Sequence, residues 1–231
     1  QAVLDVLNST SLSLGPQLRA FEGAVARYTS RRFAIGVNSG TSGLHLCVRA
    51  AGIGAGDLVI TTPFSFVASA NVILFEGAIP VFVDVDPVTG NINPDLVEQA
   101  AADLTQGGNA ARRWLPRRID GEYGKLKAIL AVDVFGQPVD WDALQVTAKR
   151  WGLSLIEDAC EALGAEYRGR KAGTFGDTAV FAFYPNKQIT TGEGGMIVTD
   201  DEEAAHLMRS LRNQGRSDGD TWLQHTYMGY N

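Results

Sequence analysis

The 231-residue sequence predicts an α/β fold, in which a mainly parallel sheet is covered by helices on both faces. Short apolar runs typical of buried strands alternate along the chain with helical segments of ten or more residues. That alternation favours a parallel sheet with both faces covered. No internal repeat, low-complexity run or interdomain linker interrupts it, so residues 1–213 are expected to form one large domain.

In the first half of the chain, each expected strand is followed by a helical segment. The expected elements are a strand at 33–37, a helix at 42–51, a strand at 58–62, a helix at 65–75 and a strand at 80–85. Asn93, Pro94 and Asp95 then open a further helix. They supply an N-cap, a proline at the first helical position and an acidic first turn.

The second half continues the alternation after an interruption. Residues 104–124 lack periodicity and contain several arginines, so a long, basic surface insertion is expected there. It would be either a functional loop or a flexible loop without a function. The elements expected after it are a strand at 128–132, a helix at 141–151, strands at 153–156, 179–183 and 196–198, and a helix at 201–213.

The composition of the chain argues against several classes of function. A formal net charge of −6 provides no broad basic surface for nucleic acid or an anionic membrane. No run reaches the roughly 18 apolar residues that a membrane helix needs, and the start carries no secretory signal. Cys47 and Cys160 lack metal-ligand or framework spacing, which indicates no metal site. Free thiols in a reducing cytoplasm are the favoured interpretation over a disulfide.

Both ends of the sequence look cut. The start, QAVLDVLNSTSLSLGPQ, has no Met and reads like the middle of a helix. The end, HTYMGYN, has neither a helix stop nor a polar tail.

In parallel sheets of this kind, ligands bind beyond the carboxyl ends of the strands. The expected strand 33–37 leads into Asn38-Ser39-Gly40-Thr41-Ser42-Gly43, which opens a helix. Glycines allow close approach, and a helix N-terminus offers unpaired N–H groups, so a phosphate fits there. A plain capped helix is the alternative. The spacing matches neither a Walker loop nor a dinucleotide fingerprint.

Two further strand ends carry charged side chains. Asp158 follows the apolar strand 153–156, where it either caps a helix or faces a buried cationic ring nitrogen. Lys187 follows strand 179–183, where it either keeps its head in water or supplies a reactive amine. A phosphate cup, a carboxylate and a lysine amine together form the set that pyridoxal phosphate (PLP) requires.

At this point a family resemblance is evident. The stretches NSGTSGLHL, TTPFSFVASANVILFEGAIPVFVDVD, FGQPVDWDAL, IEDACEALGAEYRGRKAGTFGDTAVFAFYPNKQITTGEGGMIVTDD and MGYN resemble the DegT/StrS-type nucleotide-sugar aminotransferases. The similarity covers nearly all of the chain except residues 104–124. It implies the large domain of a fold-type-I PLP enzyme of amino-sugar or polysaccharide biosynthesis. Residues 214–231 would then begin the connection to a small C-terminal domain absent from this chain.

The resemblance also implies site residues. Lys187 matches the Schiff-base lysine and Asp158 the partner of the pyridinium nitrogen, and both would act in catalysis. The other implied cofactor ligands are Gly40, Thr41 and Ser42 at the phosphate, Phe66 stacked on the ring, Glu161 near the ring hydroxyl, and Asn231 at the neighbouring subunit's phosphate. Asn231 therefore implies a homodimer with shared sites. For Phe66, a role as a core helix residue is the alternative.

Two positions depart from the family pattern. Many relatives have a serine five residues before the lysine, where this chain has Ala182. The phosphate cup is therefore expected to depend more on residues 40–42. Many relatives have Gln or His where this chain has Glu161, which leaves the tuning of the ring hydroxyl open.

The implied reaction moves an amino group from a donor, usually glutamate, to a nucleotide-linked keto-sugar. A sugar dehydratase of the same family is an alternative, but those relatives replace the lysine with histidine, and Lys187 speaks against it. A PLP-binding protein without turnover is a third hypothesis. The sequence does not identify the sugar, the nucleotide or the stereochemistry of amination.

Overall fold

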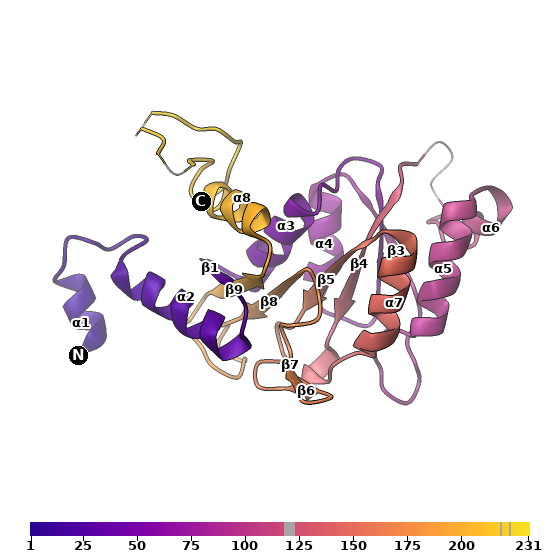
Figure 1. The fold of residues 1–231 in the computed structure, drawn as a ribbon, viewed down its shortest axis with the longest axis horizontal. Helices are drawn as coiled ribbons and strands as arrows, with labels where there is room; N and C mark the ends of the chain where they lie inside the picture. The colour runs from indigo at the N-terminus through magenta and orange to yellow at the C-terminus, as the bar shows by residue number, and fades with distance from the viewer. Residues whose placement is uncertain (118–122, 218, 222) are drawn as a thin grey trace.

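The computed structural model describes residues 1–117, 123–217, 219–221 and 223–231. Within them, a seven-stranded sheet has the order β1-β9-β8-β5-β4-β2-β3 (Figure 1). Its strands are β1 (Phe33–Val37), β2 (Leu58–Thr61), β3 (Ile79–Phe82), β4 (Leu126–Val132), β5 (Ser154–Asp158), β8 (Thr178–Ala182) and β9 (Gly195–Thr199). The four pairings from β3 to β8 are parallel, which confirms the predicted mainly parallel sheet. Only β9 runs against its neighbours, β8 and β1.

Helices cover both faces of the sheet, as predicted. The longer ones are α2 (Pro16–Thr29), α3 (Gly40–Ala50), α4 (Ala68–Phe75), α5 (Pro94–Gln106), α7 (Trp141–Trp151) and α8 (Glu202–Leu211). On one face, α3, α4 and α8 pack against alternate strand residues such as Leu130 and Ile197. On the other face, α5 and α7 pack against Ile129, and α2 packs near Phe181. Successive strand residues point to opposite faces, so both faces of each central strand are apolar.

The residues that the sequence predicted to open a helix at Asn93 do so in the structure. Asn93 caps α5, and its side chain accepts hydrogen bonds from the N–H groups of Asp95 and Leu96. The element boundaries differ by a few residues. The expected strand 80–85 is β3, which ends at Phe82, and the expected helix 65–75 is α4, which begins at Ala68.

The interpretation of residues 104–124 as a surface insertion is wrong for their first part. α5 continues to Gln106, and the short helix α6 (Gly108–Arg112) follows. Leu104, Ala111 and Leu115 are buried in the core beside α5. Two glycines with positive φ, Gly107 and Gly108, turn the chain between the helices and break the period that sequence reasoning looked for. Residues 118–122 lie outside the described residues.

Of the two helices at the N-terminus, the sequence indicated only the first. The start of the chain is helical, as its sequence suggested, and forms α1 (Ala2–Leu7). No residue of α1 is buried, and Figure 1 shows it beside α2, away from the sheet. The longer α2 was not predicted. Its buried Glu22 accepts a hydrogen bond from the Gly36 N–H at 2.8 Å and pairs with Arg212, so a charged residue occupies a core-facing position.

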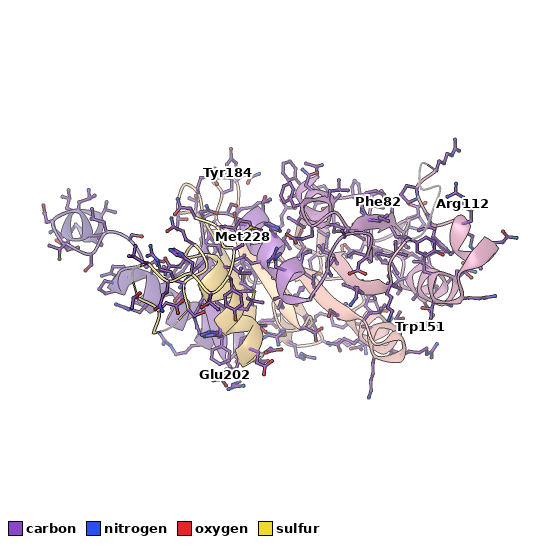
Figure 2. The ribbon with its side chains drawn as sticks, turned by 90° about the horizontal axis from the view of Figure 1, so that it is seen from above. Phe82, Arg112, Trp151, Tyr184, Glu202 and Met228 are labelled. Carbon is purple, nitrogen blue, oxygen red and sulfur yellow. The ribbon has the colours of Figure 1, made fainter. Side chains whose placement is uncertain are left out.

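The sheet has two distinct edges in Figure 2. Phe82, at the end of β3, and Tyr184, just after β8, lie on one side of the molecule. Trp151, before β5, and Glu202, after the reversed strand β9, lie on the other. The side of Phe82 and Tyr184 is the carboxyl edge, where the sequence predicted the site. A small hairpin, β6 (Glu166–Tyr167) and β7 (Arg170–Lys171), and the 3-10 helix η1 (Val134–Gly136) complete the described elements.

None of the helices among the described residues has the length and apolar character needed to cross a membrane.

Candidate active site

The three segments singled out in the sequence meet at the carboxyl edge of the sheet. Val37 ends β1 and pairs with Gly195, which also pairs with Ala182 at the end of β8. β5 lies on the other side of β8, and Asp158 pairs with Val180. The loop containing Lys187, the end of β5 and the turn into α3 are therefore neighbours, although up to about 150 residues of chain separate them.

The turn into α3 begins at Ser39. The Ser39 hydroxyl accepts a hydrogen bond from the Ser42 N–H at 3.1 Å, and the two hydroxyl oxygens are 3.0 Å apart. Ser39 is thus the N-cap, and the N–H groups of Gly40 and Thr41 belong to the first turn, where a helix offers them no acceptor. This arrangement leaves donors and the positive end of the helix dipole available to an anion.

Gly40 packs directly against the other two segments. A Cβ at this position would lie 2.8 Å from Ala182 Cβ and 2.9 Å from Cys160 Sγ. Only a residue without a side chain allows this approach. Gly40 therefore holds the start of α3 close to the ends of β5 and β8.

Asp158 is buried at the end of β5, with 6% of its surface exposed. Its Oδ2 accepts a hydrogen bond from the Ser69 hydroxyl at 2.8 Å, and its Oδ1 accepts one from the Cys160 N–H at 3.2 Å. Burial raises the pKa of Asp158, while these hydrogen bonds and the charge of Lys187 act in the opposite direction. No helix starts after Asp158, since the residues that follow form turns, so the interpretation as a helix cap is wrong.

The neighbouring carboxylate, Glu157, stabilises the fold through hydrogen bonds to the backbone. It points to the other face of β5, where its oxygens accept hydrogen bonds from the N–H groups of Phe175 at 2.9 Å and Gly176 at 3.2 Å. The alternation of side chains along β5 thus separates a structural acid from one that faces the site.

Lys187 lies in the turn after β8, where its N–H donates to the Tyr184 carbonyl at 2.9 Å. Its ammonium lies 2.8 Å from Glu161 Oε1, and only 17% of the lysine side chain is exposed. A lysine that kept its head in water would be more exposed and would not need this partner. The structure therefore places a covered, paired amine beside the end of β5.

The other two predicted residues are at the margin of this group. Phe66 precedes α4 and is 80% exposed, so the alternative role as a core helix residue is wrong. Asn231 lies near the turn into α3, and its backbone carbonyl accepts a hydrogen bond from Asn38 Nδ2 at 3.1 Å. Its role toward a second subunit stays a prediction.

Sequence reasoning missed two residues at this edge. Ser69 is 2% exposed and donates a hydrogen bond to Asp158, which is 89 positions away in the sequence. No pattern near Ser69 in the sequence indicates this contact. Asp133 directly follows β4 and is 1% exposed, so the strand-end rule could have found it. Its Oδ1 accepts a hydrogen bond from the Val139 N–H at 3.0 Å. Burial and the nearby charge of Glu157 raise the pKa of Asp133 well above its ordinary value.

The two cysteines are not arranged for nucleophilic chemistry. Cys47 and Cys160 carry free thiols. Burial raises the pKa of Cys47 to about 12 and that of Cys160 well above its ordinary value, so neither is an activated nucleophile. Within the described part of the chain, no group of three or more His, Cys, Asp or Glu side chains is arranged to hold a metal ion.

A cavity at the opposite edge of the sheet is lined by residues that include Arg31, Asp177 and Asp200. The guanidinium of Arg31 donates to the carbonyls of Gly173 at 2.9 Å and Gly176 at 2.6 Å, and to Asp200 at 2.7 Å. These groups hold loops together and leave no converging reactive set. We therefore assign the candidate site to the carboxyl edge.

The chain is similar to known proteins in sequence and in fold. The chain matches the DegT/DnrJ/EryC1/StrS aminotransferase family over residues 1–231. GDP-perosamine synthase of Caulobacter vibrioides is 42% identical over 214 residues, which cover 92% of this chain and 52% of that protein. The chain spans about half the length of the curated relatives it matches.

Two solved structures show the same fold. A DegT DnrJ EryC1 StrS aminotransferase from Brucella abortus has a TM-score of 0.83 and 33% identity, covering 94% of this chain and 54% of that one. NtdA from Bacillus subtilis, solved with bound cofactor PMP, has a TM-score of 0.78 and 28% identity, covering 99% of this chain and 48% of that one.

Proposed function

The chain belongs to the DegT/DnrJ/EryC1/StrS aminotransferase family, and from this premise we propose that it forms the cofactor-binding part of a PLP-dependent aminotransferase. The reaction would move an amino group from a donor, glutamate in our proposal, to a nucleotide-linked keto-sugar. The observation that carries the proposal is the convergence of three features at one edge of the sheet. They are the covered amine of Lys187, the buried carboxylate of Asp158 and the open first turn of α3.

These residues fit the cofactor in chemistry. The first-turn N–H groups of α3 and the hydroxyls of Thr41 and Ser42 suit a phosphate. Gly40 brings this turn against Ala182 and Cys160, where any side chain would clash. Because position 182 is an alanine, the phosphate would depend more on this turn than it does in relatives with a serine there.

Asp158 would hold a proton on the ring nitrogen of the cofactor. Ser69 and the Cys160 N–H fix the orientation of its carboxylate. Burial excludes water, which strengthens the electrostatic contact. When bound, PLP supplies an electron sink for cleavage of bonds at the amino-bearing carbon.

Lys187 would bind the cofactor and then move the proton at the reacting carbon. Glu161, 2.8 Å from its amine, holds the lysine at the site and would lie near the ring hydroxyl. The exposed ring of Phe66 would cover one face of the cofactor.

We also propose that the full-length protein is a homodimer with shared sites, in which Asn231 serves the partner's phosphate. Residues 1–213 would form the large domain, and residues 214–231 would begin the connection to a second domain. The free thiols suit a reducing compartment, and we place the enzyme in the cytoplasm.

The test is a two-step reaction of the full-length protein loaded with PLP. Glutamate alone should bleach the visible absorption band of the cofactor, and a suitable nucleotide keto-sugar from a panel should restore it. Lys187→Ala is the matched control. A band that glutamate never bleaches would refute the aminotransferase proposal, and conversion of the sugar to a deoxy product without 2-oxoglutarate release would indicate a dehydratase instead.

A further inference from the structure

An exposed pair of aromatic rings lies at the carboxyl edge of the sheet. Phe64 follows β2 and Phe135 follows β4, and the two rings meet edge to face with their centroids 5.8 Å apart. Phe64 is 46% exposed and Phe135 is 81% exposed. A contiguous aromatic surface of this kind, at the margin of a site, is typical of a surface that binds a ligand.

The backbone of Phe135 is strained. Its φ of 53° and ψ of 23° lie in the left-handed region, which a bulky residue rarely adopts. Such a conformation destabilises the fold and persists only where the surroundings hold it in place. Since the ring stays exposed, the fold gains no buried apolar surface in return. Strain of this kind is concentrated at ligand-binding and catalytic sites, which indicates a functional position for the ring.

A buried asparagine holds the loop that carries Phe135. Asn91 is 3% exposed, and its Nδ2 donates to the carbonyls of Gln137 at 2.9 Å and Pro138 at 3.2 Å. Its Oδ1 accepts a hydrogen bond from the Val134 N–H at 3.1 Å. The Gln137 N–H also donates to the Val134 carbonyl at 3.0 Å. Because these bonds lie on both sides of Phe135, a fixed backbone directs its ring toward solvent.

The same loop borders the candidate site. A Cβ on Gly136 would lie 2.6 Å from the carbonyl oxygen of Glu161, so the loop packs directly on the residue that pairs with Lys187. β4 lies between β5, which carries Asp158, and β2, which leads to Phe64 (Figure 1). Because neighbouring strands are about 4.8 Å apart, the strand ends that carry the two rings are about 5 and 10 Å along the edge from β5. The rings thus extend the candidate site along the edge.

The chemistry of the rings suits one part of the proposed substrate. The face of an aromatic ring carries partial negative charge, so it attracts C–H groups and repels anions. A sugar ring offers a face of C–H groups, whereas the diphosphate of a nucleotide sugar and the carboxylates of glutamate are anionic. The sugar also carries the reacting carbon, so it must lie nearest to Lys187, while the base lies beyond the diphosphate. The sugar is therefore the part that the position of the rings favours.

We propose that Phe135, supported edge-on by Phe64, is a specificity-determining residue that packs against the C–H face of the sugar ring in the nucleotide-linked substrate. The inference rests on the proposed function in one respect, that a nucleotide-linked sugar binds at this edge of the sheet. It adds which part of that substrate the chain recognises here and through which side chain.

The test measures dissociation constants by titration calorimetry on the full-length protein loaded with PLP. The probes are UDP-glucose, GDP-mannose and dTDP-glucose, each compared with its free nucleoside diphosphate. Phe135→Ala should weaken binding of the hexose probes about tenfold, the scale of one aromatic contact, while binding of the free diphosphates changes less than about twofold. Phe135→Tyr keeps the ring face and should stay within about twofold of wild type. Phe75→Ala is the matched control, because this ring is 58% exposed but lies at the far end of α4, just before β3 begins.

An unchanged affinity of Phe135→Ala for the hexose probes would overturn the proposal. An equal loss for the hexoses and the free diphosphates would overturn it too, because the ring would then contact the nucleotide. A weaker dimer with unchanged hexose affinity would place the ring between subunits instead. If Phe135→Ala does not fold, Phe64→Leu removes the edge-on support and must show the same hexose-specific loss. A wild-type protein that binds no probe would refute the proposed substrate class together with this role, whereas a loss confined to the variants tests Phe135 alone.

Discussion

Ser69→Ala should destabilise the protein and do so more at high pH than at low pH. The substitution removes the hydroxyl that donates to Asp158 Oδ2 at 2.8 Å, at a position with 2% exposure where water cannot replace it. A hydrogen bond to a charged group contributes about 1.5–3 kcal/mol to the free energy of unfolding. For a domain of this size, each kcal/mol lowers the unfolding midpoint by about 2–4 °C.

The pH dependence follows from the raised pKa of Asp158. Because its folded pKa lies above the unfolded value of 3.8, the folded state binds the proton more tightly. The stability that Asp158 contributes is then greatest at low pH and falls as the pH rises through the folded pKa. Removing a donor to the charged form raises that pKa further, so the deficit of Ser69→Ala should grow as the pH rises above 3.8 and through the folded pKa.

The assay is thermal unfolding of the full-length protein without cofactor at several pH values. Ser65→Ala is the control, because the Ser65 hydroxyl lies 2.9 Å from Ser69 Oγ without being a partner of Asp158. An equal midpoint shift in both variants, or a deficit in Ser69→Ala that does not change with pH, would refute the assignment of Ser69 as the residue that holds Asp158.

Three further outcomes are expected of the full-length protein. Lys187→Ala should lose the visible cofactor band in an absorbance scan while its circular dichroism spectrum stays unchanged, and a variant that kept both the band and turnover would contradict the assignment. Asp158→Asn should retain some cofactor but lose at least about a hundredfold in turnover, the scale of one preorganised electrostatic contact; near-normal rates would return Asp158 to a structural role. If Asn231 serves the partner's phosphate, PLP affinity should fall as the protein is diluted below its dimer dissociation constant, whereas a monomer with constant affinity would count against shared sites.

The parts of the fold that the sequence predicted are those with a strong local signal. Strand 33–37 was placed correctly because five consecutive non-polar residues follow two arginines. The start of α5 was correct because its cap, proline and acid are adjacent. α2 was missed because a buried Glu22, paired with Arg212 from the far end of the chain, occupies a position where an apolar residue is expected. The hairpin of β6 and β7 has two-residue strands, too short to show any period.

In the candidate site, too, some features could be predicted from the sequence and others could not. The convergence of Lys187, Asp158 and the turn at Gly40 was predicted because the ends of parallel strands meet at one edge, a rule that needs only the order of elements. Ser69 could not be found, since its contact with Asp158 depends on how α4 lies against β5. The pairing of Lys187 with Glu161 likewise depends on the conformation of two loops, which no local pattern specifies.

The reversed direction of β9 has a consequence for how Lys187 is held. Because β8 and β9 are antiparallel neighbours, the segment between them closes on itself, and the Phe183 N–H donates to the Gly194 carbonyl at 2.9 Å. A parallel partner would have required a long crossover on one face of the sheet. Lys187 is therefore held in a short loop between two neighbouring strands, and local contacts of this kind lower the contact order of a fold. Doubling the length of such a loop adds only about 0.6 kcal/mol of closure cost. Loop closure therefore places little thermodynamic limit on the length of this segment.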